Sequence, residues 1–214
     1  MIRYLLKFVF EKAYAEALLN GELFMRPACY YHKLEMGQGD IYEAALSHDM
    51  CVYKHSRVPV FCACAVNDRE ITDDSFAVSE RCIKDFKCEN GYVVILDFQK
   101  FEQALSTLLS SGYEVDGGLV NYHKLTFEDM GELIGDNTAR NLFVKHPYFS
   151  YQKEFRIVVC REVYKLGDRP VDSIIYRFPR DLTGIAVCKE VAEFKQDAHY
   201  LFHVPDFNKC LNAF

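Results

Sequence analysis

Apolar residues fall along this chain in short runs or in alternation with polar ones, which is the pattern of half-buried and fully buried strands. The opening run, residues 1–10, predicts a strand, and the helix-forming residues 11–20 after it end at Asn20-Gly21, a common signal for a helix C-terminus. Further strands are predicted at residues 22–25, 58–66, 92–98, 118–125, from 154 onward, 173–178 and 182–187.

Helical patterns are concentrated in the first two-thirds of the chain. They are predicted at residues 79–88, with Ser79 as the cap, and at 99–109, 127–144 and 205–214. Strands spread along the whole length predict an α+β fold rather than a regular alternation of strand and helix. With 214 residues and no clean boundary or linker, the chain predicts one domain over residues 1–214.

Composition and charge narrow the class of protein. Half the residues are hydrophobic, 26% are charged and the formal net charge is −6, so a globular protein without a general basic field for nucleic acid is expected. The nine cysteines are scattered singly through apolar runs, which predicts reduced thiols and a cytoplasmic location. No run approaches the roughly 18 apolar residues of a membrane span, and residues 1–10 lack a signal-peptide cleavage site, so no membrane partner is expected.

Candidate functional residues are most concentrated in residues 145–159, where titratable and aromatic residues precede an apolar strand. Alternation places Gln152, Glu154 and Arg156 on one face of that strand. Either Glu154 is an active-site carboxylate held by its neighbours, or it forms an ordinary surface ion pair on an edge strand. Taken alone, the stretch slightly favours the surface ion pair.

Other motifs in the sequence are weaker evidence for a functional site. Cys62 and Cys64 have no second ligand pair at zinc-site spacing, and His199 and His203 fall in a strand-like stretch, so no metal site is predicted. Asp97 stands where a strand passes into a helix, which favours a helix N-cap over a nuclease metal ligand. Residues 30–43 combine aromatic and acidic side chains with two glycines, and they form either a polar pocket or a solvated loop.

The order of these features resembles that of the ADP-ribosyltransferase-like superfamily, most closely its poorly characterised bacterial and phage-borne domains. The likeness covers about residues 2–160 and leaves 161–214 as a C-terminal extension. It is carried by the opening strand, by the aromatic-acidic segment from Tyr31, and by Lys145, Tyr148 and the Tyr151-Gln152-Lys153-Glu154-Phe155-Arg156 stretch.

The resemblance implies a split, mostly antiparallel β core with flanking helices that binds NAD. Glu154 would stabilise the oxocarbenium-like ribose as nicotinamide leaves, with Gln152 as its catalytic partner. NAD would be contacted by Arg3, Lys7, Tyr31, Lys145, Tyr148, Tyr151 and Arg156. The Ser-Thr-Ser strand of the toxin type is absent from the sequence.

Three hypotheses about function follow. The first is an enzyme that cleaves the nicotinamide glycosidic bond of NAD and transfers ADP-ribose to a protein, a nucleic acid or water, in toxin or phage-conflict biology. The second is a catalytically silent domain of the same fold that binds a ligand or a protein. The third is a metal-dependent nuclease around Asp97.

Overall fold

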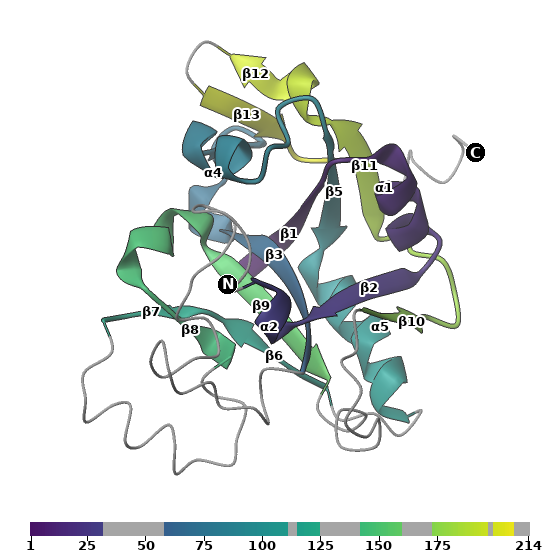
Figure 1. The fold of residues 1–214 in the computed structure, drawn as a ribbon. Coiled ribbons are helices and arrows are strands. Elements are labelled where there is room, and N and C mark those ends of the chain that lie inside the picture. The colour runs from purple at the N-terminus through teal and green to yellow at the C-terminus, as the bar shows by residue number, and fades with distance from the viewer. Residues whose placement is uncertain (32–57, 111–114, 125–141, 160–172, 197–198, 208–214) are drawn as a thin grey trace. The chain divides into compact units, whose positions relative to one another are not determined.

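The computed structural model describes residues 1–31, 58–110, 115–124, 142–159, 173–196 and 199–207 (Figure 1). These residues form mostly antiparallel sheets with few helices, which confirms the predicted α+β class. The chain divides into two compact units. Unit 1 comprises residues 1–23, 63–111 and 176–214, and unit 2 comprises residues 24–62 and 112–175.

Unit 1 is built on an antiparallel sheet. In it β1 (Ile2–Val9) pairs with β3 (Pro59–Asn67) on one side and with β5 (Tyr92–Asp97) on the other, and β11 (Ala186–Glu190) pairs with β5. Residues 93–97 of β5 are all buried, so both faces of this strand are covered. The apolar runs at residues 1–10 and 92–98 therefore mark central strands.

Two helices pack on this sheet. The first, α1 (Lys12–Leu19), contacts β5 and β11, and α5 (Phe98–Ser110) contacts β1 and β5. Gly21 follows α1 with a φ of +85°, and a Cβ there would lie 2.7 Å from the carbonyl oxygen of Arg180. Only glycine fits this position, which explains the Asn20-Gly21 signal.

A second sheet of unit 1 joins the strands β12 (Lys195–Gln196), β13 (His199–His203) and β4 (Ser75–Val78) in that order. The ring of Phe202 stacks on those of Phe76 and Phe194, with centroids 5.6 and 4.4 Å apart, and forms the core beneath the sheet. His199 and His203 lie on a strand, as the sequence predicts. Short helical segments of unit 1 are α4 (Glu80–Asp85), η1 (Asp68–Glu70) and η4 (Val191–Phe194).

Unit 2 contains residues 145–159, the stretch in which the sequence places most of the candidate site residues. Its remaining elements are α2 (Ala28–Tyr31), β6 (Val115–Leu119), β7 (Asn121–Tyr122), β8 (Val144–Lys145), η3 (Pro147–Gln152) and β9 (Glu154–Val159). Strands β2 (Glu22–Pro27), β3 and β10 (Ile174–Arg177) have residues in both units. Antiparallel pairs join β6 to β9 and Arg26 of β2 to Val60 of β3, whereas β7 and β8 are parallel.

The core of unit 2 brings together segments that are far apart in sequence. Val158 of β9 is fully buried with Leu142, Val58, Val60 and Ala28. Tyr31, Cys62 and Phe143 pack against this cluster. Burial of Val158 in this cluster anchors β9 and so helps to position the polar residues at its start.

Several predicted boundaries are corrected. The helix predicted at residues 127–144 does not include Val144, which begins β8, and residues 125–141 lie outside the described part. The strand predicted from residue 182 starts at Ala186, since Ile185 donates its N–H to the Leu182 carbonyl in a turn. Helix α4 ends at Asp85 and Lys87 is left-handed with a φ of 54°, so the predicted helix does not reach Cys88. Residues 205–207 are not helical, and the rest of that predicted helix lies outside the described residues.

Asp97 is the N-cap of α5, which confirms the capping interpretation. Its Oδ1 accepts the Lys100 N–H at 3.1 Å. We expect Asp97→Ala to lower the free energy of unfolding by about 1 kcal/mol, because that N–H loses its acceptor. Ser79 is the matched control, since it occupies the N-cap of α4 without a side-chain cap bond. Urea unfolding of both variants should show a clearly smaller loss for Ser79→Ala, and equal losses would contradict the assignment.

Candidate functional site

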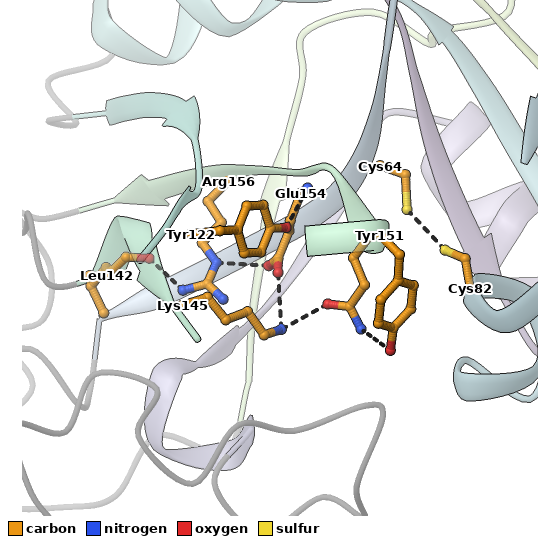
Figure 2. A network of polar contacts seen from close by, with 9 residues as sticks. Cys64, Cys82, Tyr122, Leu142, Lys145, Tyr151, Glu154 and Arg156 are labelled. Atoms are coloured by element: carbon orange, nitrogen blue, oxygen red, sulfur yellow. Dashed lines mark hydrogen bonds and ion pairs between the residues drawn. The ribbon is translucent and has the colours of Figure 1, made fainter. Parts of the chain in front are cut away.

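Four buried polar side chains of unit 2 form one network at the junction of β8, η3 and β9 (Figure 2). They are Lys145, Gln152, Glu154 and Arg156. Among the described residues, the only other buried charged side chain is that of Asp97. Charged groups are almost never fully buried unless they are paired, so this network is the strongest chemical feature of the described chain.

Glu154 lies between two cations. Its Oε1 accepts from Arg156 Nε at 2.7 Å, and its Oε2 accepts from Lys145 Nζ at 3.1 Å. Arg156 also donates from Nη1 to the Leu142 carbonyl. Because each contact involves an ionised group, these bonds are stronger than neutral ones and hold the carboxylate in one orientation.

Lys145 connects Glu154 to the second predicted catalytic residue. Its Nζ donates to Gln152 Oε1 at 2.9 Å, and it lies 4.8 Å from the ring centroid of Phe149. Gln152 in turn places its Nε2 3.5 Å from the Tyr151 hydroxyl. One lysine therefore fixes Gln152 and Glu154 relative to each other.

The backbone at the start of β9 is also held. The Glu154 N–H donates to the Tyr122 hydroxyl at 2.8 Å, and the Glu154 carbonyl accepts from the Val120 N–H at 2.9 Å. Lys153, immediately before it, ends η3 in the left-handed region with a φ of 45°. Such a conformation costs a non-glycine residue of order 1 kcal/mol or more, and strain of this kind gathers at functional sites.

The electrostatics of the network keep Glu154 ionised. Burial by itself raises the pKa of Glu154, but the charges of Arg156 and Lys145, with hydrogen bonds from Arg156 and Cys62, outweigh it. The pKa of Glu154 therefore lies well below its ordinary value of 4.5. At neutral pH the network carries two positive charges and one negative charge.

This depressed pKa predicts an acid dependence of stability. A carboxyl group whose pKa is lower in the folded than in the unfolded state contributes stability that is complete above the unfolded value and is lost as the pH falls toward the folded one. We therefore expect the free energy of unfolding to decline below about pH 5, and to decline less steeply in Glu154→Gln. Urea titrations at pH 7, 5, 4 and 3 measure this, and parallel pH profiles for the two proteins would contradict it.

The structure corrects two expectations for this stretch. The ion pair of Glu154 and Arg156 is not on the surface, because the two residues are 5% and 0% exposed. Gln152 does not share the strand with them, since Pro147 starts a 3₁₀ helix that ends at Gln152. It nevertheless reaches the same network through Lys145.

Tyr148 and Tyr31, which were predicted to contact NAD, both lie in unit 2. Tyr148 is 53% exposed and packs edge-to-face on Phe149 at 5.1 Å. Tyr31 directs its hydroxyl to the Val60 carbonyl at 3.5 Å and packs on the unit 2 core. The pocket predicted for residues 30–43 lies outside the described residues beyond Tyr31.

Arg3 and Lys7 lie on β1 and belong to unit 1, with the Arg3 guanidinium 5.6 Å from the Tyr4 ring centroid. All the other predicted site residues belong to unit 2. Contact of Arg3 and Lys7 with NAD phosphates stays a prediction.

Two further residues that contact this network were not predicted. Tyr122 accepts the Glu154 N–H from 32 residues away, and Cys62 hydrogen-bonds to the Glu154 carboxylate from β3. Nothing local in the sequence signals either contact, because both depend on how distant strands pair.

The described residues contain no group of histidine, cysteine and acidic side chains that could hold a metal ion. Within the same residues, no helix combines the length and apolar character needed to cross a membrane. The five cysteines whose side chains are described are thiols rather than disulfides: Cys62, Cys64, Cys82, Cys88 and Cys188.

Comparison of the chain with protein-family models, with curated proteins and with solved structures found no match.

Proposed function

We propose that this protein is an ADP-ribosyltransferase-like enzyme that cleaves the nicotinamide glycosidic bond of NAD and passes ADP-ribose to a macromolecule or to water. The observation that carries the proposal is the Glu154 carboxylate, which is ionised, buried and held at both oxygens. It stands in the Tyr151-Gln152-Lys153-Glu154-Phe155-Arg156 stretch that carries part of the resemblance.

The chemistry of the reaction requires such a group. Positive charge develops on the ribose as nicotinamide leaves, and a carboxylate already fixed in place stabilises that charge without reorganising. Each carboxylate oxygen has two lone pairs, so a bond to Lys145 or Arg156 leaves acceptor capacity for a ribose hydroxyl. Arg156 and Lys145 orient Glu154, and Lys145 presents Gln152 beside it.

Tyr148 supplies a surface for the planar nicotinamide ring in this proposal. It is the exposed aromatic residue of η3, and its neighbour Phe149 holds it edge-to-face. Stacking of aromatic rings of this kind contributes about 0.5–1.5 kcal/mol beyond the area that is buried.

A second candidate function is a catalytically silent domain that binds a ligand or a protein. Two observations favour it. Glu154 is buried, with only 5% of its surface exposed, and its carboxylate is paired with two cations. A carboxylate neutralised in this way stabilises a developing positive charge less than an isolated one.

Two measurements on the unmodified protein separate the candidates. Calorimetric titration with NAD measures binding, and chromatographic detection of nicotinamide measures cleavage, both with and without a cell extract as a source of acceptors. The enzyme proposal predicts binding and time-dependent nicotinamide release. Binding without release supports the silent domain, and neither binding nor release overturns the NAD proposal.

A further inference from the structure

Two buried thiols of unit 1 lie in contact. The Sγ atoms of Cys64 on β3 and Cys82 on α4 are 3.6 Å apart, and either thiol can donate to the other (Figure 2). The residues are 8% and 1% exposed. They are 18 positions apart in sequence, so their contact joins the sheet to a helix that is only six residues long.

We propose that Cys64 and Cys82 are an oxidation site, at which a two-electron oxidant forms a disulfide that links β3 to α4. The sulfurs need to approach from 3.6 Å to the roughly 2.05 Å of an S–S bond. We expect a small displacement of α4, which is only six residues long, to bring the two sulfurs together. Low exposure makes the reaction depend on local opening of α4, so small oxidants react faster than large ones.

The chemistry balances with a diazene oxidant such as diamide. One thiolate adds to the N=N bond, and the second thiol displaces the resulting hydrazine nitrogen from sulfur. Both S–H bonds are lost, one S–S bond forms, and the two electrons and two protons reduce the diazene to a hydrazine.

Two other cysteines of unit 1, Cys88 and Cys188, are expected to react slowly by themselves. Cys88 donates its thiol to the Phe86 carbonyl at 3.2 Å, and burial raises the pKa of Cys88 to about 11. Cys188 lies on β11, and burial likewise raises its pKa to about 11. Since the thiolate is the reactive form, both thiols react slowly at neutral pH.

The test is to treat the folded protein with diamide, to alkylate the remaining thiols under denaturing conditions, and to map tryptic peptides by mass spectrometry. A peptide of residues 58–69 joined to one of residues 82–84 is expected, with loss of the link in Cys64→Ser and Cys82→Ser and retention in Cys188→Ser. Cys64→Ser also excludes Cys62, which lies on the same peptide. The mapping uses the unmodified protein first, so a variant that fails to fold does not remove the test.

Oxidation is also expected to raise the melting temperature, by roughly 5–10 °C, because the cross-link restricts the unfolded chain. Dithiothreitol should reverse the rise. Separate alkylation of both cysteines after oxidation, or a disulfide that involves another pair, would overturn the proposal.

Discussion

Glu154→Gln is expected to lower the free energy of unfolding by about 3–5 kcal/mol, because it leaves two buried cations without their shared counter-charge. Glutamine keeps the shape and one acceptor oxygen, so the loss is mainly electrostatic. Lys145→Met is expected to cost less, about 1–3 kcal/mol, since one cation and one anion remain and the main loss is the donor to Gln152. The order of the two variants follows from the charge count.

An exposed ion pair of unit 1 provides the control. Glu22 accepts from Arg177 at 3.0 Å, but their side chains are 32% and 70% exposed. Such pairs contribute at most about 1 kcal/mol, so Glu22→Gln should change stability little. Chemical unfolding of the three variants at pH 7 measures all of these effects. A loss in Glu154→Gln no larger than that in Glu22→Gln would contradict the burial of the network.

Much of the fold follows from local sequence. The central strand β5 is a continuous apolar run, and β1 is a mostly apolar one that contains Arg3 and Lys7. Gly21 ends α1 because only glycine fits there, and Asp97 caps α5 where strand passes into helix. These features depend on period, conformation and neighbours within about four residues, which the sequence displays directly.

The sequence predicts the site only in part, because its burial depends on residues that are distant in the chain. The sequence places Glu154 beside Arg156, but nothing local distinguishes a surface strand from one covered by distant segments. The burial of β9 comes from Val58, Val60 and Leu142, and the Tyr122 contact comes from the arrangement of β7 beside β8. Long-range packing therefore converts the favoured surface ion pair into a buried three-charge network.

Glu154→Gln is also expected to reduce NAD turnover by roughly a hundredfold or more, because the carboxylate acts on charge that exists only in the transition state. NAD affinity should change little, since the bound ground state carries no comparable charge at the ribose. Tyr148→Ala should show the opposite pattern, with weaker NAD binding and a smaller effect on the rate of cleavage, because it removes a stacking surface rather than a charge.

Since Glu154→Gln also destabilises the protein, activity must be compared at equal amounts of folded protein, at a temperature well below the melting point of each sample. Asp97→Ala serves as the control for partial destabilisation, because it removes the α5 cap of unit 1 and leaves the Glu154 network unchanged.

A catalytic role for Glu154 is tested by the rate of nicotinamide release from saturating NAD, compared between folded unmodified protein and folded Glu154→Gln. We expect measurable release by the unmodified protein and a rate lower by roughly a hundredfold or more in Glu154→Gln, with NAD still bound. Equal rates in the two proteins, or no release by the unmodified protein with any acceptor, would contradict a catalytic role for Glu154.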